Sequence, residues 1–198
     1  MENFFDGMNN RRNVKAFIQD NYPQRFEIDS ILDKTMLLSP IKNDIYHFSV
    51  QIYGPEHANE KEKLVLNTIR DEDKKNLPIQ EIKKHYGNKT AKFNNQVKAP
   101  YLLLYKKSLN HHNTNKFSGG NYEIAAMGAM IHGYVVSVIA NQRNIQASFC
   151  ACYSNKDNPN YIINNREDFY FMLGLGYAKS TDYKVKKMPK LDEVREWK

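Results

Sequence analysis

The stretch NYEIAAMGAMIHGYVVSVIANQR, residues 121–143, decides the fold. No formally charged residue occurs between Ile124 and Ala140, which predicts a long helix buried on nearly all sides, with His132 as a hydrogen-bonded core histidine. A membrane span is the weaker alternative, because the run is short and is interrupted by glycines and a histidine. Small residues recur every four positions, so that a helix or a sheet could approach this ridge closely; they are Ala125, Ala129, Gly133, Ser137 and Asn141.

The opposite face of this helix is bulky, with Met127, Ile131 and Val135 among its members. A helix buried on both faces in a chain of this size favours a subunit interface as well as a core. A central helix in a monomer is the alternative. In either case the helix organises the rest of the chain around it.

Patterns on either side of this helix predict the other elements. Apolar residues at helical spacing predict a helix from about residue 27 to residue 36, ended by Ser39-Pro40. Gly174 and Gly176 lie inside an apolar strand, which often marks close backbone approach. Strands are expected at 46–53, 99–105, 145–153 and 169–177, a charged helix at 59–76, and short helical pieces at 2–9, 79–86 and 191–197.

Length and composition describe a folded cytoplasmic protein. The chain has 198 residues, of which 41% are hydrophobic and 26% charged, so a single domain over 1–198 is expected. The first residues lack a long apolar run, so no signal peptide is predicted. The net charge of +7 favours an anionic partner, such as a phosphate-bearing cofactor, a nucleic acid or an anionic surface.

Two basic clusters are candidates for an anion site. Arg11, Arg12, Asn13 and Lys15 offer forked donors, an amide and a point charge, which suit a phosphate group. In an extended segment residues 11, 13 and 15 share one side, so they could converge on one ligand. A solvated basic turn is the alternative. The second cluster, Lys184, Lys186 and Lys187, could close the same site, although the sequence does not place the two together.

The two cysteines, Cys150 and Cys152, are expected to share one face of a strand. They are too few for a disulfide scaffold, and a metal site would need two further ligands that the sequence does not offer. No neighbouring base supports a catalytic thiol. We therefore expect two small residues packed beneath a strand, and no metal site.

Taken in order, these segments resemble the nitroreductase family of FMN-dependent, NAD(P)H-linked oxidoreductases. RRNVKAF at 11–17 is similar to the opening motif Arg-(Arg/His)-Ser-x-(Arg/Lys)-x-Phe of that family. Leu38-Ser39-Pro40 with Asn43 is similar to its segment before the first strand. The long helix followed by NIQAS at 144–148 resembles its central helix and the strand after it. LGLGY at 173–177 and KMPKLDEV at 187–194 resemble its closing strand and basic tail.

The resemblance implies an α+β fold with a mixed central sheet flanked by helices, an intertwined homodimer, and two FMN sites at its interface. It implies a reaction in which hydride passes from NAD(P)H through the flavin to a nitroaromatic, a quinone or a similar acceptor. Neither a nucleic acid nor a membrane is then a partner.

The family roles transfer position by position. Arg11 and Asn13 would bind the FMN phosphate and ribityl chain, and Arg12 would add a phosphate or backbone contact. Lys15 would lie near the pyrimidine edge of the flavin, and Asn43 would come from the partner subunit. The backbone of Phe149, Cys150, Ala151 and Cys152 would line the flavin, and Lys186 or Lys187 would complete the phosphate clamp.

Several positions depart from the family pattern. Asn13 replaces a serine, Asp44-Ile45-Tyr46 replaces Gln-Pro-Trp, and Phe149 and Cys152 stand where the family has flavin-lining proline and glycine. Two alternatives to a reductase therefore remain. One is a flavin-binding relative without reductase turnover, and the other is a basic nucleic-acid-binding protein.

Overall fold

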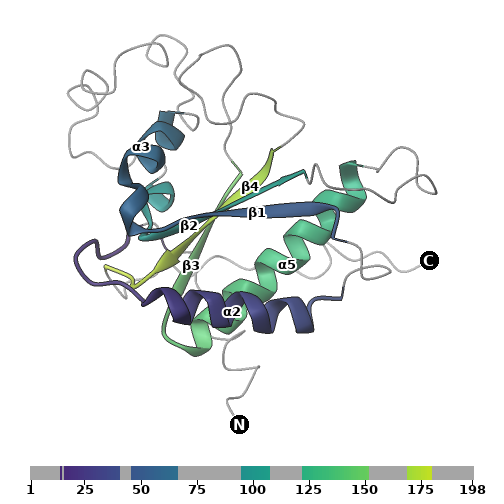
Figure 1. Cartoon of the computed structure of the whole chain (residues 1–198), viewed down its shortest axis with the longest axis horizontal. Helices are drawn as coiled ribbons and strands as arrows, with labels where there is room; N and C mark the ends of the chain where they lie inside the picture. Colours follow the sequence, from purple (N-terminus) through teal and green to yellow (C-terminus); the bar gives the residue numbers. More distant parts are fainter. Residues whose placement is uncertain are drawn as a thin grey trace, which may run out of the picture.

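A single antiparallel sheet forms the centre of the structure (Figure 1). The computed structural model describes residues 14, 16–40, 46–66, 95–107, 122–151 and 169–179. The strands are hydrogen-bonded in the order β1-β2-β4-β3, and all three pairings are antiparallel. The prediction of a mixed sheet is therefore wrong for the described strands, which are all antiparallel. Their bounds are Phe48–Tyr53 for β1, Tyr101–Lys107 for β2, Gln146–Cys150 for β3 and Phe169–Gly176 for β4.

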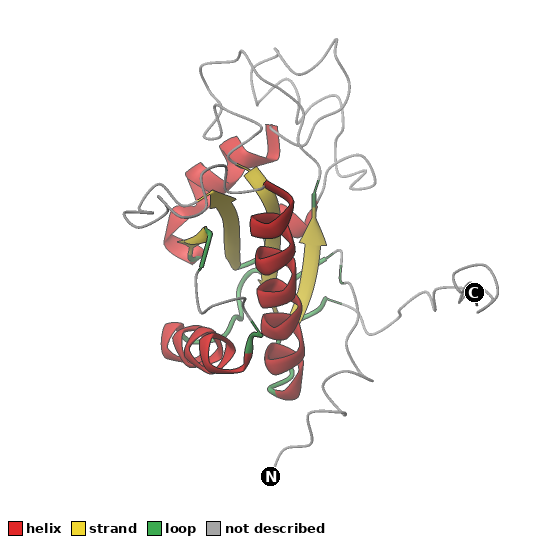
Figure 2. Ribbon diagram, turned by 90° about the vertical axis from the view of Figure 1, so that its right-hand side faces the viewer, coloured by secondary structure: helices red, strands yellow, loops and turns green. Residues whose placement is uncertain are grey.

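Helices cover both faces of this sheet. On one face, α2 and α5 pack against each other and against the strands; on the other lie α3 and the short 3-10 helix η4 (Figures 1 and 2). This arrangement of helices around a sheet confirms the predicted α+β class. The bounds are Arg25–Leu38 for α2, Pro55–His57 for η2, Ala58–Leu66 for α3, Asn95–Lys98 for η4 and Tyr122–Gln142 for α5.

Most of these elements begin and end within a few residues of the bounds predicted from the sequence. The helix expected from residue 27 is α2, which begins two residues earlier, where the Glu27 carboxylate accepts a hydrogen bond from the Gln24 amide. The four predicted strands are β1 to β4; β1, β3 and β4 are shorter than expected, and β2 has the expected length but begins and ends two residues later. The described part of the charged helix is α3. The pieces predicted at 2–9, 79–86 and 191–197 lie outside the described residues.

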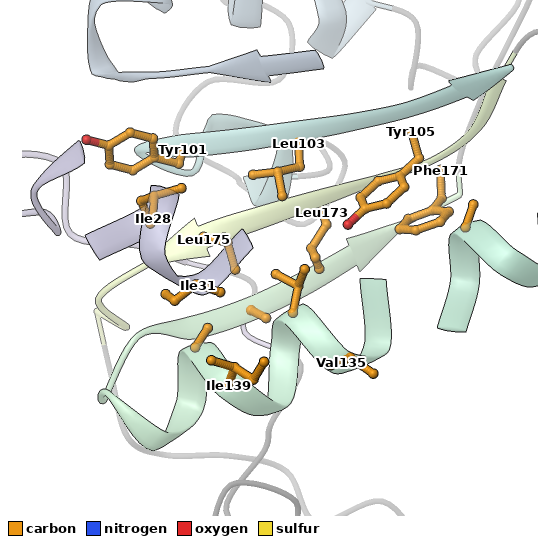
Figure 3. Close-up of a cluster of buried hydrophobic side chains, with 14 of the residues drawn as sticks. Ile28, Ile31, Tyr101, Leu103, Tyr105, Val135, Ile139, Phe171, Leu173 and Leu175 are labelled. Carbon is orange, nitrogen blue, oxygen red and sulfur yellow. The ribbon is translucent and has the colours of Figure 1, made fainter. Parts of the chain in front are cut away.

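The larger of two main core clusters lies between the sheet and the α2–α5 layer (Figure 3). Side chains alternate between the two faces along β2 and β4, which decides the cluster to which each residue belongs. Leu103 and Leu173 point into this layer, whereas Leu104 and Met172 point to the α3 side. Because both faces are covered, β4 is buried along its whole length. Its near-continuous apolar run follows from this double burial.

The small-residue ridge of α5 meets the sheet as predicted. A side chain at Gly133 would place its Cβ 2.6 Å from the Phe171 ring, so only glycine allows this helix–sheet distance. Within the described chain one stripe of α5 is exposed, so the predicted burial on nearly all sides would require the predicted subunit interface as well as the core. That stripe is apolar and consists of Met127, Met130, Ile131 and Tyr134.

None of the helices in the described part of the chain combines the length and the apolar character that crossing a bilayer requires. The uncharged run of α5 is instead explained by the core on one side and the apolar stripe on the other. The two strand glycines also behave as predicted. A Cβ at Gly174 would collide with the Gln96 carbonyl oxygen, and one at Gly176 would lie 2.7 Å from the Pro100 ring.

Candidate functional site

The structure describes part of the predicted site. Phe149, Cys150 and Ala151 are described, at the end of β3. Val14 and Ala16, the sequence neighbours of Lys15, are described as well. The other predicted residues lie outside the described residues, and they are Arg11, Arg12, Asn13, Lys15, Asn43, Cys152, Lys186 and Lys187.

The segment that follows the first basic cluster pairs with the segment that precedes the second. Phe17 and Ala178 form an antiparallel bridge. The Ile18 amide donates to the Tyr177 carbonyl at 2.9 Å, and the Lys179 amide donates to the Ala16 carbonyl at 3.0 Å. We call this region, residues 14 and 16–18 with 146–147 and 177–179, the terminal junction.

The start of β3 completes the terminal junction. The Val14 amide donates to the Ala147 carbonyl at 3.2 Å, and the Gln146 side-chain oxygen accepts the Ala178 amide at 3.0 Å. Three segments far apart in the sequence are therefore bonded to one another through their backbones. Among its described residues the junction carries one cation, the exposed Lys179, and no acid, which suits an anionic ligand.

A small apolar cluster packs against the terminal junction. Val14, Phe17 and Ala99 are all buried and pack together. Phe17 also lies against β4, where a Cβ at Gly176 would be 3.1 Å from its ring and 2.7 Å from the Pro100 ring. The position of the N-terminal segment therefore depends on residues 99–100 as well as on β4.

At the end of β3, neighbouring side chains point to opposite faces. Phe149 is half-buried on the α5 side, with its ring 5.5 Å from that of Phe171. Cys150 is buried on the α3 side among Leu104 and Met172, as expected for a small residue beneath a strand. Ala151 is exposed. The Cys150 side chain therefore belongs to the core and is not available to contact a ligand.

No cluster of potential metal ligands occurs among the residues that the structure describes. The described part of the terminal junction contains one lysine and no acidic residue, so it offers binding groups rather than an acid–base pair.

Lys61, a buried cation on α3, was not identified from the sequence. Its Nζ donates to the carbonyl oxygens of Ala99 at 3.0 Å and Pro100 at 2.8 Å. Burial lowers the pKa of Lys61 to about 8, and the nearby carboxylate of Glu56 opposes this shift. One signal could have revealed it: Lys61 precedes the buried Leu64 by three residues, so both lie on the same face of the helix.

The predicted core histidine is confirmed. His132 is 1% exposed, and its Nδ1 lies 2.9 Å from the Tyr105 hydroxyl. Burial lowers the pKa of His132 to about 4 and raises the pKa of Tyr105, because each charged form would lack solvation. The other ring nitrogen, Nε2, is buried without a hydrogen-bond partner among the described residues.

Comparison with known proteins identifies the fold. No protein-family model and no curated protein matches the sequence. Among solved structures, the FMN- and NADPH-dependent nitroreductase NfnB from Sphigopyxis sp. strain HMH superposes with a TM-score of 0.66 at 14% identity, covering 99% of both chains. A nitroreductase with bound FMN from Desulfitobacterium hafniense DCB-2 gives 0.63 at 12% identity, covering 100% of this chain and 99% of that one.

A nitroreductase-like family protein from Bacillus cereus gives a TM-score of 0.66 at 14% identity, covering 98% of this chain and 95% of that one. These superpositions extend over nearly the full length of each chain. The protein therefore has the nitroreductase fold, as its sequence motifs implied.

Proposed function

We propose that this protein is an FMN-dependent oxidoreductase in which hydride passes from NAD(P)H through the flavin to a nitroaromatic, a quinone or a similar acceptor. The terminal junction carries this proposal. Because Phe17 pairs with Ala178, the chain segments adjoining the two basic clusters are held side by side. The nitroreductase fold supports the same conclusion, since FMN is bound in a solved structure that shares it.

The FMN phosphate would be held by cations from both ends of the chain. Arg11 and Arg12 precede the junction in sequence, and Lys186 and Lys187 follow it. Each charged hydrogen bond to the phosphate would contribute about 1.5–3 kcal/mol. The absence of acids from the described part of the junction fits this role.

The remaining proposed contacts surround the ribityl chain and the ring. Asn13 would donate an amide hydrogen bond to the ribityl chain, and Lys15 would place positive charge near the pyrimidine edge. The backbone from Phe149 to Cys152 would line the flavin, in agreement with the exposure of Ala151 at the end of β3. Asn43 would be contributed by the partner subunit.

Bound FMN would supply the redox chemistry, since flavins accept hydride from nicotinamides and reduce organic acceptors. The chain itself would bind and orient the reactants. Its cations would favour the more negative, reduced form of the cofactor electrostatically. No side chain is assigned the role of a general acid or base.

We also propose that two copies associate through α5. Its exposed apolar stripe contains Met127, Met130, Ile131 and Tyr134, all spaced to lie on one side of the helix. Such a stripe on a soluble-protein surface favours association, because burial removes apolar area from water. Met127→Glu with Ile131→Glu should convert a dimer to a monomer in sedimentation equilibrium, whereas Lys63→Glu on α3 should not.

Purified protein tests the function directly. We expect it to show flavin absorption in the visible range and to release FMN on heating. Colourless protein that takes up no added FMN would refute the proposal. If FMN binds but stays oxidised when mixed rapidly with NADH or NADPH, the protein is a flavin-binding relative without turnover.

Arg11→Ala tests the phosphate assignment. The loss of one charged contact should weaken FMN binding roughly 10- to 100-fold in a fluorescence titration. Arg25→Ala is a matched control, because Arg25 is an exposed arginine on α2 whose pair with Asp29 is long, at 3.8 Å. Unchanged affinity in Arg11→Ala, with the control also unchanged, would show that the phosphate lies elsewhere.

A further inference from the structure

Lys61 joins α3 to the residues immediately before β2. Its ammonium group donates to two consecutive carbonyls, those of Ala99 and Pro100, although the side chain is only 7% exposed. A buried cation is unfavourable unless it is well hydrogen-bonded, so these two bonds account for its place in the fold. The carboxylate of Glu56 favours the charged form of Lys61 electrostatically.

The carbonyls that Lys61 holds belong to the residues that support the terminal junction. Ala99 is fully buried against Val14 and Phe17. Pro100 packs beside Gly176, where the Phe17 ring also approaches. A continuous set of contacts therefore runs from the Lys61 ammonium group through residues 99–100 to the N-terminal segment.

Neighbouring contacts leave residues 99–100 little freedom to move. The Gln96 carbonyl oxygen and the Ala99 side chain are so close to Gly174 that no other residue fits there. The Ala99 amide donates to the Gln96 carbonyl at 3.2 Å, which closes the turn after η4. Lys61 bonds the carbonyls of the same two residues from α3, so its loss would remove the hydrogen bonds that tie residues 99–100 to that helix.

We propose that Lys61 is a positioning residue for the N-terminal cofactor-binding segment, fixing Ala99 and Pro100 so that Phe17 and Val14 sit in register with β3 and β4. The first part of this inference concerns residues 14 and 16–18 alone. The second part, an effect on the cofactor, rests on the proposed FMN function.

Amide hydrogen exchange in the full-length protein tests the first part. The amides of Val14, Ile18 and Lys179 are the donors of the three hydrogen bonds between backbone groups that join the N-terminal segment to the rest of the junction. In Lys61→Met, we expect them to exchange about tenfold faster relative to amides of the β2–β4 ladder, because the charged donor that holds residues 99–100 is lost. Lys61→Arg keeps a charged donor and should restore slow exchange.

Lys63→Met is the matched control, with the same substitution on an exposed lysine of the same helix, and should leave every amide unchanged. If Lys61→Met does not fold, Lys61→Gln keeps an uncharged donor and should give a smaller acceleration at the same three amides. Equal acceleration of all amides in these variants would mean a purely structural role and would overturn the inference.

FMN titration of the same variants tests the second part. We expect Lys61→Met to weaken FMN binding by about the same factor as it accelerates amide exchange at the junction. Lys61→Arg should keep the FMN affinity of the unsubstituted protein. Faster exchange with unchanged FMN affinity would reject the effect on the cofactor. If the unsubstituted protein takes up no FMN, the proposed function fails, while the exchange data still decide whether Lys61 positions the segment.

Discussion

The Tyr105 hydroxyl lies 2.9 Å from Nδ1 of His132, inside the layer between the sheet and α5. The Tyr105 ring stacks on Phe171 at a centroid distance of 4.2 Å (Figure 3), and the His132 ring lies edge-on to Tyr105 and Phe48. The core therefore contains one polar pair within an aromatic cluster. Since either partner alone would be a buried polar group, the stability of the fold depends on both.

Acid should destabilise the protein through His132. Its pKa is lowered to about 4 in the folded state, against an ordinary value of 6.5, so the unfolded state binds the proton first as the pH falls. The contribution of this group is complete above pH 6.5 and is lost towards pH 4, at up to about 1.4 kcal/mol per pH unit. Urea unfolding over this range measures the slope.

His132→Gln is the control for this slope. Glutamine can still hydrogen-bond the Tyr105 hydroxyl but does not titrate. The unfolding free energy of this variant should therefore fall less steeply as the pH is lowered. Identical slopes for the two proteins between pH 6.5 and pH 4 would show that protonation of His132 does not govern the loss.

Tyr105→Phe should destabilise the fold at neutral pH. Removal of the hydroxyl leaves both ring nitrogens of His132 without a partner among the described residues, at a cost of about 1–3 kcal/mol. A double-mutant cycle with His132→Leu isolates the pair, because the double variant leaves neither group unsatisfied. Additive losses would show that the two side chains are not coupled.

Gly133→Ala and Gly128→Ala should act in opposite directions. At Gly133 the new Cβ would be 2.6 Å from Phe171 and 3.3 Å from Phe149, which should cost about 1–3 kcal/mol through forced repacking. At Gly128 the nearest atom is 3.8 Å away, on Phe48, so alanine should stabilise the helix by about 0.5–1 kcal/mol. Thermal unfolding of both variants gives the sign of each change in stability. Stabilisation by both substitutions would contradict the close helix–sheet contact.

Arg143 should be needed to hold α5 against α2. Its Nη1 donates to the Glu27 carbonyl at 3.2 Å, and its Nη2 donates to the Ser30 hydroxyl at 3.0 Å. Lysine carries one compact ammonium group in place of the planar fork whose two nitrogens make these bonds, so Arg143→Lys should lower the unfolding free energy by about 1–2 kcal/mol. Ser30→Ala removes one bond and should cost less. A larger loss in Ser30→Ala than in Arg143→Lys would argue against this arrangement.

Hydrophobic periodicity was enough to predict the described α-helices and strands of this fold, but not the short 3-10 helices η2 and η4. The alternation in β1 predicts the strand and the burial of Phe48, although Ile52 of the predicted apolar face is exposed. The uncharged run in α5 predicts the long helix but not its exposed stripe. The directions of the strands in the sheet were harder to predict, since local patterns do not reveal whether neighbouring strands run parallel or antiparallel. The expected mixed sheet was wrong for the described strands for that reason.

Contacts between distant residues account for what the sequence did not reveal. Lys61 belongs to a helix whose composition is that of a solvated surface, and its burial follows from the carbonyls of residues 99–100, which lie far away in sequence. Similarly, composition predicts that both basic clusters favour anions but cannot place them together. Only the pairing of Phe17 with Ala178 brings their neighbouring segments into one region.

The same pairing sets the order in which the protein can assemble during synthesis. Phe17 is synthesised long before Ala178, its partner, because the described helices and strands lie between them in the sequence. The first segment must therefore remain unpaired while those elements are produced, and the long loop that the pairing closes slows this step further. A nascent chain that ends before β4 would contain most of the core-forming segments, but its terminal junction could close only after Ala178 had been made.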